Sequence, residues 1–361
     1  AKTMVDDRNR YWTTSRVELR AAGFDPDAAR ELNQVVTVAA SHTNAHRCNN
    51  RVARISDLVL DALTRIGSQG LIVGTPAVSD ALTQGTPNAG YSLVSRDLIA
   101  DCIELGHRAH HGNALIVISG CDKVGAAAMM PLARTNDVGL VIYPGTSSPG
   151  SVDLEPWAAK GNNLTILDYA EARAAEEAGR ISAEDLEEVE RCIMPGSGTC
   201  GAMFTANTMS TITEAIGMML PRGASHPADV NAAGDVHDDV KAQVNASVEA
   251  LANLVEADLR PRDIMTMEAF ENAITLLCAI GGSTNAVVHL PASAGRLNID
   301  LPLDLFDRIS RRTPVIASLR PSGAYQMEDL HHAGGLPVLL KALEPLLTLD
   351  AMTITGKTMG E

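Results

Sequence analysis

Short runs of consecutive apolar, largely β-branched residues alternate with amphipathic or helix-forming segments along the first part of the chain. The apolar runs lie at residues 35–41, 71–78, 114–118 and 139–143. The segments between them lie at residues 51–66, 95–110 and 126–134. A run that is apolar at every position fits a strand buried on both faces of a parallel sheet. The alternation therefore predicts an α/β fold built on a parallel sheet.

The pattern changes to mostly helical in the second half. Residues 164–193 are acidic and predict solvated helices, one of them starting at a capping Ser182. A Gly-rich turn at residues 195–201 then opens a long helix to about residue 220, and residues 229–361 are mostly helical. We therefore predict an N-terminal arm with a short helix over residues 1–34. Residues 35–361 would form one domain, a three-layer α/β core with a largely helical C-terminal half.

Polar residues with metal-binding side chains follow three of the predicted strands. Cys48 follows the first strand, Asp80 the second, and Cys121, Asp122 and Lys123 the third. Parallel strands end at one edge of their sheet, and ligands bind in the crevice beyond that edge. These side chains could therefore converge on a site. A turn with a buried cysteine, a capping aspartate and a solvated lysine explains the last three equally well.

Cys200 lies in the Gly-rich turn, where we expect a helix N-terminus to stabilise a thiolate. Cys192 and Cys278 are expected to pack in the interior, as is His289, which lies on an apolar helix face. The chain has six cysteines and no Cys-x-x-Cys pair. Any metal site must therefore use cysteines that are far apart in the sequence.

The net charge of −15, without a Lys/Arg-rich run, argues against nucleic acid and anionic membranes as partners. No apolar run is long enough for a membrane span, and no signal-peptide pattern begins the chain, so the expected location is the cytoplasm. No Gly-x-Gly-x-x-Gly follows the first strand, which makes a dinucleotide-binding domain a weak alternative.

Several long motifs, in order, resemble the N-terminal domain of the dihydroxy-acid and sugar-acid (phosphogluconate) dehydratase family. They are Gly-Cys-Asp-Lys at 120–123, Gly-Thr-Cys-Gly-Ala-Met-Phe-Thr-Ala-Asn-Thr-Met at 198–209, Ala-Ile-Gly-Gly-Ser-Thr-Asn-Ala-Val-Val-His-Leu at 279–290, Leu-Arg-Pro-Ser-Gly at 319–323, Met-Glu-Asp-Leu-His-His-Ala-Gly-Gly-Leu-Pro at 327–337 and Thr-Gly-Lys-Thr-Met-Gly-Glu at 355–361. The resemblance covers nearly the whole chain.

The resemblance implies a hydro-lyase that dehydrates a 2,3-dihydroxy acid to a 2-keto acid. It implies an iron–sulfur cluster, 2Fe-2S rather than 4Fe-4S, on Cys48, Cys121 and Cys200. It also implies Mg²⁺ on Asp80 and Asp122, with Lys123 joining as a catalytic carbamate. Thiolates suit iron–sulfur clusters and carboxylates suit Mg²⁺. A branched-chain dihydroxy acid is the favoured substrate, and a sugar acid is the alternative.

The chain departs from the family pattern at three places. Ala45-His-Arg-Cys replaces the usual Asn-Pro-Cys, Ala81 replaces a glycine after Asp80, and Gly125 replaces a common proline. The first departure motivates a further alternative, a non-catalytic metal-binding relic. Motifs of the family's second, β-rich domain, with its Mg²⁺-binding glutamate and serine base, were not found. We therefore expect the chain to end at the linker to that domain, which would belong to the same enzyme. The resemblance also implies a homodimer or a homotetramer.

Overall fold

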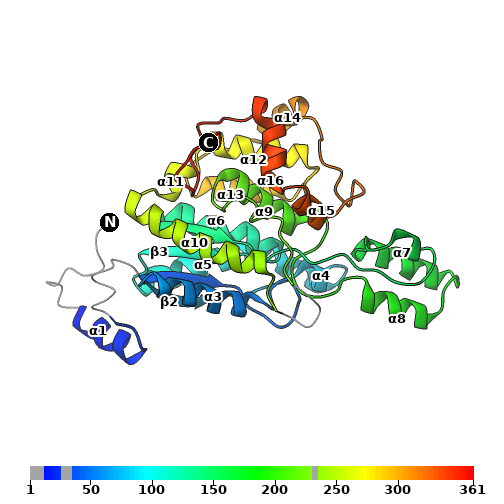
Figure 1. Ribbon diagram of the computed structural model, residues 1–361, viewed down its shortest axis with the longest axis horizontal. Helices are drawn as coiled ribbons and strands as arrows, with labels where there is room; N and C mark the ends of the chain where they lie inside the picture. Colours follow the sequence, from blue (N-terminus) through cyan, green and yellow to red (C-terminus); the bar gives the residue numbers. More distant parts are fainter. Residues whose placement is uncertain (1–11, 26–34, 230–234) are drawn as a thin grey trace.

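The computed structural model describes residues 12–25, 35–229 and 235–361 (Figure 1). Its sheet has four parallel strands in the order β2-β1-β3-β4. These strands are β1 (Val35–Ala40), β2 (Gln69–Gly74), β3 (Ala114–Ile118) and β4 (Val138–Ile142). Every residue of β1, β3 and β4 is buried, whereas the edge strand β2 leaves Ile72 47% exposed. The predicted parallel sheet is confirmed, and the continuous apolar runs reflect its two covered faces.

Helices cover both faces of the sheet, which confirms the predicted three-layer core. Helix α3 (Val52–Arg65) packs on β1 and β2, and α10 (Asp238–Ala257) lies beside it on β4. Helix α5 (Gly90–Ala109) packs on β2, and its neighbour α6 (Asp122–Thr135) packs on β3 and β4. Right-handed crossovers explain this division. From β1 the chain passes through α3 to the edge strand β2. It then returns through α5 to β3, on the other side of β1, and continues through α6 to β4.

The second half of the chain adds mostly helices, as predicted (Figure 1). They include α9 (Thr205–Ile216), α11 (Pro261–Ile264), α12 (Met267–Ala279), α13 (Ala286–Gly295), α14 (Leu303–Arg312), α15 (Met327–His332) and α16 (Leu336–Leu343). Of these, α9, α11 and α13 pack against α6. Helix α9 is buried along its whole length, because α6, α12, α13 and α16 all pack against it. Helix α6 is equally buried except at Arg134, so the site residues at its start are held in a rigid interior.

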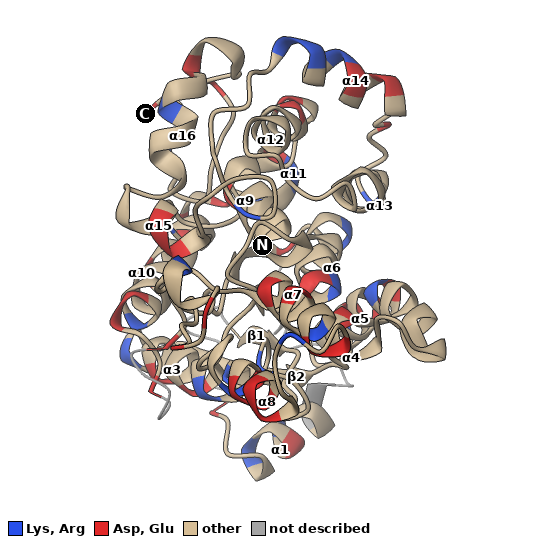
Figure 2. Ribbon diagram, turned by 90° about the vertical axis from the view of Figure 1, so that its right-hand side faces the viewer, with Lys and Arg blue, Asp and Glu red and all other residues tan. Residues whose placement is uncertain are grey.

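Two acidic helices form a separate projection with a small core of its own. They are α7 (Ile166–Glu177) and α8 (Ala183–Cys192), and they pack around Trp157 (Figures 1 and 2). Capping boxes at Thr165 and Ser182 start them, as predicted for Ser182. Most acids here face solvent, as expected. The exception is Asp168, whose carboxylate is fully buried between Lys160 and Arg320.

Several predicted boundaries are wrong. Helix α5 begins at Gly90 rather than residue 95, so Ser95 lies inside it and donates to the Ser92 carbonyl. Helix α6 begins at Asp122 rather than residue 126, and α9 ends at Ile216 rather than near residue 220. Polar residues and a glycine in the first turn of α6 hid its start, because this buried turn is held by packing rather than by helix propensity.

The remaining short elements are α1 (Trp12–Ala21), α4 (Asp80–Thr83), η1 (Pro87–Ala89), η2 (Ala158–Lys160) and η3 (Glu344–Leu346). Helix α1 matches the short helix expected before residue 34; the rest of that arm, residues 1–11 and 26–34, lies outside the described residues. None of the helices described at 12–25, 35–229 and 235–361 is both long and apolar enough to cross a membrane.

Asp168→Asn should destabilise the fold by about 3–5 kcal/mol, because Lys160 and Arg320 would lose a buried ionic partner. Burial alone would raise the pKa of Asp168, but hydrogen bonds from Lys160, Arg320 and Thr165 lower it. A lowered pKa stabilises the fold above the unfolded value, near 4, and this contribution disappears as pH falls through the folded value. Urea unfolding should therefore show a lower free energy of unfolding for Asp168→Asn than for wild type at neutral pH, and this difference should disappear below about pH 4.

The exposed Glu171, which also pairs with Lys160, provides the control. Glu171→Gln should change the free energy of unfolding by less than about 1 kcal/mol. If Asp168→Asn and Glu171→Gln lowered the free energy of unfolding equally, the burial of the Asp168 carboxylate would not matter for stability.

Candidate functional site

The predicted site residues follow the carboxyl ends of adjacent strands. The chain leaves the central strand β1 toward Cys48 and leaves its neighbour β3 toward Cys121. Between β1 and β3 the winding of the sheet reverses, because β2 lies on one side of β1 and β3 on the other. Loops diverge at such a switch point and leave a crevice for ligands. The two cysteines lie at this position.

The structure brings the three predicted cysteines together. The Sγ atoms of Cys48 and Cys121 and one ring nitrogen of His46 lie within 4.8 Å of one another, and all three residues are buried. Cys200 is close enough for its charge to act on Cys48 and for that of Cys121 to act on it. We refer to Cys48, Cys121 and Cys200 as the thiol cluster: the first two thiols adjoin each other, and Cys200 lies within range of their charges.

The side chain of Asn49 ties the first two cysteine loops together. Its Nδ2 donates to the Ser41 carbonyl at 2.6 Å, and its Oδ1 accepts from the Cys121 N–H at 2.9 Å. A Cβ at position 120 would lie 2.5 Å from this amide, so Gly120 allows the close approach. Asn49 thereby fixes the loop of Cys48 against the turn of Cys121.

Backbone and side-chain hydrogen bonds hold the third cysteine loop against the first. Gly198 N–H donates to the Arg47 carbonyl at 3.1 Å, and Thr146 Oγ1 donates to the Cys200 carbonyl at 3.0 Å. The side-chain amide of Asn207, on α9, donates to the same carbonyl. Gly198 has φ +102°, and a Cβ there would meet Ser147 and Ala228. The Gly-rich turn therefore serves close packing of the loop that carries Cys200.

The thiols differ in acidity because their surroundings differ. A hydrogen bond from Cys48, partly opposed by burial, lowers the pKa of Cys121 to about 6, and Ser79 contributes. The bond to Cys121 and burial raise the pKa of Cys48 well above its usual range. Burial raises the pKa of Cys200 to about 11. Cys121 also precedes helix α6 directly, where the helix dipole favours its thiolate.

The expectation that a helix N-terminus stabilises the Cys200 thiolate is wrong. Helix α9 begins at Thr205, five positions further on, because residues 201–204 turn before the helix forms. The cysteine whose thiolate a helix N-terminus favours is Cys121, directly before α6.

The predicted metal residues Asp80, Asp122 and Lys123 also meet. Lys123 Nζ donates to Asp80 Oδ2 at 2.9 Å and to Asp122 Oδ2 at 2.5 Å. Its side chain is only 6% exposed, so the alternative of a solvated lysine is wrong. Asp122 Oδ1 accepts the Lys123 N–H at 2.8 Å, and Asp80 Oδ1 is buried without a partner.

Burial and the neighbouring carboxylates shape the charges of this group. Burial, the hydrogen bond with Asp80 and the nearby Cys121 raise the pKa of Asp122 to about 9. Burial would also raise the pKa of Asp80, but hydrogen bonds from Asp122 and Lys123 lower it. Burial would lower the pKa of Lys123, but Asp122 and Asp80 raise it. The Lys123 ammonium thus occupies the space between the two carboxyl groups, and Asp122 retains a proton at neutral pH.

His289 packs in the interior, as expected, but one of its ring nitrogens is unpaired. It is 1% exposed and its Nδ1 lies 3.3 Å from Arg96 Nη1, but its Nε2 has no hydrogen-bond partner. Burial and the charges of Lys123 and Arg96 lower its pKa to about 4. His289 therefore borders the metal residues as a neutral ring. Its apolar helix pattern concealed this, because the pattern does not show which helix faces which loop.

The donors fit the groups that the resemblance implies. Thiols converge from three loops, those of Cys48 and Cys121 buried and that of Cys200 half-buried, and soft thiolates suit iron–sulfur clusters. Two carboxylates beside them include the unpartnered Asp80 Oδ1, a hard oxygen ligand of the kind Mg²⁺ takes. Ser79 links the thiols to the carboxylates, because its Oγ lies 3.6 Å from Cys121 Sγ and the residue directly precedes Asp80 in the chain.

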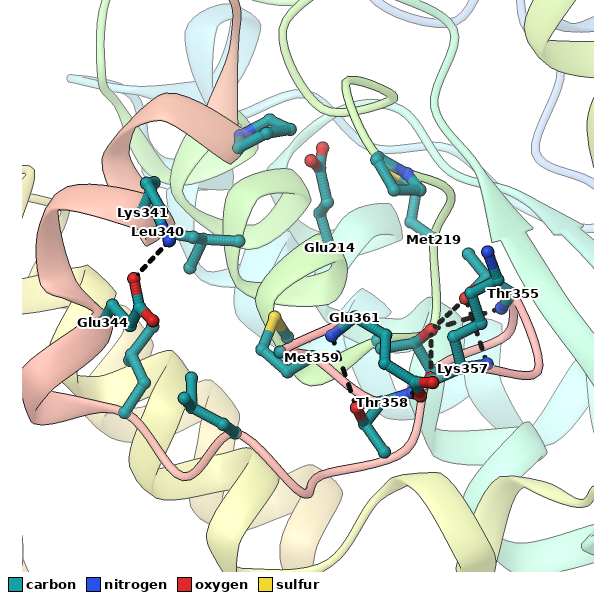
Figure 3. Close-up of a pocket in the computed structure, with 17 residues that line it drawn as sticks. Glu214, Met219, Leu340, Lys341, Glu344, Thr355, Lys357, Thr358, Met359 and Glu361 are labelled. Atoms are coloured by element: carbon teal, nitrogen blue, oxygen red, sulfur yellow. Dashed lines mark hydrogen bonds and ion pairs between the residues drawn. The ribbon is translucent and has the colours of Figure 1, made fainter.

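A cavity of about 440 Å³ elsewhere in the chain is not this site. It opens between α9, α16 and residues 349–361, beside Glu214, Leu340 and Met359 (Figure 3). Its lining includes none of the six predicted site residues, all of which are described. Glu214 is fully buried there; burial raises its pKa to about 7, and its carboxylate accepts the backbone N–H groups of Arg222 and Ala224. We therefore assign it a structural role.

Asn49→Ala should destabilise the fold by about 1–3 kcal/mol, because the Cys121 N–H and the Ser41 carbonyl would lose a buried partner. It should also speed the reaction of Cys48 and Cys121 with a thiol reagent, since their loops would separate more readily. Urea unfolding and timed thiol titration check both effects. Asn50→Ala is the matched control, because Asn50 Oδ1 has no partner. Equal thiol reactivity in the two variants would contradict the role of Asn49.

Comparison with known proteins supports the same reading. Residues 33–361 match the family model described as dihydroxy-acid/6-phosphogluconate dehydratase N-terminal. The chain is 42% identical to a dihydroxy-acid dehydratase of Leptothrix cholodnii over 329 residues, 91% of this chain and 56% of that protein. It is 42% identical to that of Sulfurisphaera tokodaii over 350 residues, 96% of this chain and 60% of that protein.

A dihydroxy-acid dehydratase of Cytophaga hutchinsonii is 40% identical over 349 residues, 96% of this chain and 59% of that protein. The chain thus spans less than two thirds of the length of these relatives. The match over almost every described element shows that this chain belongs to the dihydroxy-acid/6-phosphogluconate dehydratase N-terminal family.

Proposed function

We propose that the protein containing this chain is a hydro-lyase that dehydrates a 2,3-dihydroxy carboxylic acid to a 2-keto acid. A branched-chain dihydroxy acid is the favoured substrate, in line with the names of its relatives. The observation that carries the proposal is the thiol cluster next to two carboxylates that share one lysine. Soft and hard metal ligands side by side suit a reaction that must hold a carboxylate and remove a hydroxyl.

Cys48, Cys121 and Cys200 would hold an iron–sulfur cluster, 2Fe-2S rather than 4Fe-4S, and Asp80, Asp122 and Lys123 would hold Mg²⁺. When bound, these groups would supply Lewis acidity toward a leaving hydroxyl and toward the substrate carboxylate. The chain itself supplies a site from which water is largely excluded, since Cys48 and Cys121 are 7% and 6% exposed. Low water content strengthens every charge interaction there.

Lys123 must change state before Mg²⁺ binds. Its ammonium lies 2.9 Å and 2.5 Å from the two carboxylates and competes with a divalent cation for them. A neutral lysine amine can add CO₂ to give a carbamate and release one proton. The carbamate is an anion with two oxygen donors, so the same side chain would then attract Mg²⁺ instead of repelling it.

The test starts with the native protein purified without oxygen, or reconstituted with iron and sulfide. We expect bound iron and acid-labile sulfide, two of each per chain for a 2Fe-2S cluster. Formation of 2-keto acid should be faster from 2,3-dihydroxy-3-methylbutanoate than from a pentonate or 6-phosphogluconate. Protein that takes up neither iron nor sulfide would refute the proposal. Faster turnover of either sugar acid would favour that alternative.

A non-catalytic metal-binding relic is a second candidate, favoured by His46 and Arg47 in place of the usual residues before Cys48. A relic would bind iron and sulfide but turn over none of the three substrates. A homodimer or homotetramer and a cytoplasmic location stay predictions. Light scattering of the purified protein would measure the first.

A further inference from the structure

His46 is a buried histidine that none of the assignments above uses. It lies in the loop between β1 and α3 and is 9% exposed. Neither ring nitrogen makes a hydrogen bond of good geometry, and the Ala77 backbone is the polar group that acts on the ring. Leaving a buried polar group unpaired costs about 1–3 kcal/mol, so such a group in a well-packed site indicates an additional ligand.

The ring is placed where a metal ligand would be. One ring nitrogen and the Sγ atoms of Cys48 and Cys121 all lie within 4.8 Å of one another. Bonds of 2.0–2.3 Å to one tetrahedral metal ion would separate its ligand atoms by roughly 3.3–3.8 Å. Each iron of a 2Fe-2S cluster would take two protein ligands, so the ring nitrogen would share one iron with one of these thiols, and a shift of about 1 Å or less per atom would bring that pair to the required separation. Among the described residues, no other group of three or more His, Cys, Asp and Glu side chains gathers its donor atoms this closely.

Another histidine shows that lack of a partner is not enough. His226 is also buried with both ring nitrogens unpaired, but its ring packs at 6.1 Å from the Tyr143 ring. It belongs to no such donor group. The position of His46 beside two thiols is therefore the distinguishing observation.

The loop of His46 is also held in place. Arg47 Nη1 donates to the Met194 carbonyl at 2.8 Å, and the Arg47 carbonyl accepts from Gly198. On the other side, Asn49 binds the turn of Cys121. Anchors on both sides of His46 hold its ring near the thiols, and such support orients a metal ligand.

We propose that His46 is a nitrogen ligand of the metal centre held by the thiol cluster, so that the resting centre carries one imidazole beside the three thiolates. The proposal rests on the function proposed above for Cys48, Cys121 and Cys200. It predicts that the coordination position left open by three thiolates is filled by a neutral ring until substrate arrives. A substrate hydroxyl would then replace the imidazole by ligand exchange, without any change in oxidation state.

The test is pulsed EPR of the reduced, substrate-free native protein, with and without ¹⁵N-histidine labelling. We expect a strong nitrogen coupling that changes from the ¹⁴N to the ¹⁵N pattern on labelling. His46→Ala should lose the coupling and keep iron and sulfide on the three cysteines. His42→Ala, which changes an exposed histidine in the same loop, should keep the coupling. His46→Gln, of similar bulk, replaces His46→Ala if that variant does not fold.

An iron-loaded wild-type cluster without a directly bound nitrogen would overturn the proposal. A coupling that survives in His46→Ala or His46→Gln would overturn it as well. In both cases the function proposed above would stand, because iron and sulfide would still be bound. Wild-type protein that takes up no iron would refute the proposed function, and this inference with it.

Discussion

Cys121→Ser is expected to strip iron and sulfide from the protein and to abolish dehydratase activity. Cys121 is the most acidic thiol of the cluster, with a pKa near 6, and contacts Cys48, Ser79 and Asp122. A serine hydroxyl is almost the same size but stays protonated at neutral pH and is a poor ligand for iron. Since loss of a supporting contact alone costs about 10–100-fold, loss of a ligand should lower activity by at least about 100-fold. Iron and sulfide assays and keto-acid formation measure both effects.

The matched control is Cys102→Ser, which removes a half-buried thiol on α5 outside the thiol cluster. It should retain iron, sulfide and activity. Circular dichroism should show the same helix content in both variants, because serine fits the space of cysteine. If Cys121→Ser keeps its full iron and sulfide, the cluster is not held where we propose.

The sheet could be predicted from sequence because β3 and β4 are apolar at every position, β1 is apolar except at Thr37, and all three are buried. The starts of helices α5 and α6 could not be predicted from the sequence. Gly90 and Asp122 are not strong helix formers, and neither helix has a side chain that caps its first turn. Packing of its buried first turn decides where α6 begins, whereas α5 continues directly from η1. Local propensity does not contain that information.

The candidate site, too, could be predicted from the sequence only in part. Cys48, Asp80 and Cys121 could be placed at one edge because parallel strands end together. Cys200 joins them through Gly198, Thr146 and Asn207, hydrogen bonds that no sequence pattern reveals. His46 and His289 were not selected as site residues, because a single histidine in a loop or on a helix is usually structural. The geometry supplies what the sequence lacks, an unpaired ring nitrogen beside the thiols and another beside the metal residues.

Lys123→Met is expected to destabilise the metal-free protein and to remove its response to Mg²⁺. Without the ammonium, Asp80 and Asp122 would face each other with no cation between them. Removing one partner of a buried ion pair costs about 3–5 kcal/mol. Without a carbamate, Mg²⁺ affinity should fall by about 100-fold or more. Urea unfolding and calorimetric Mg²⁺ titration measure the two effects, and ¹³CO₂ labelling should give a carbamate signal in the wild-type protein but not in Lys123→Met.

Lys160→Met separates metal binding from the general loss of a bridging lysine. Lys160 also joins two carboxylates, at 2.7 Å from Asp168 Oδ1 and 2.7 Å from Glu171 Oε2, but it lies in the α7–α8 projection. The Lys160 side chain is 32% exposed, against 6% for Lys123. Lys160→Met should therefore lower the free energy of unfolding less than Lys123→Met does. Its Mg²⁺ affinity and carbamate signal should equal those of wild type. If both lysine variants bind Mg²⁺ like wild type, Lys123 has only the structural role that Lys160 has.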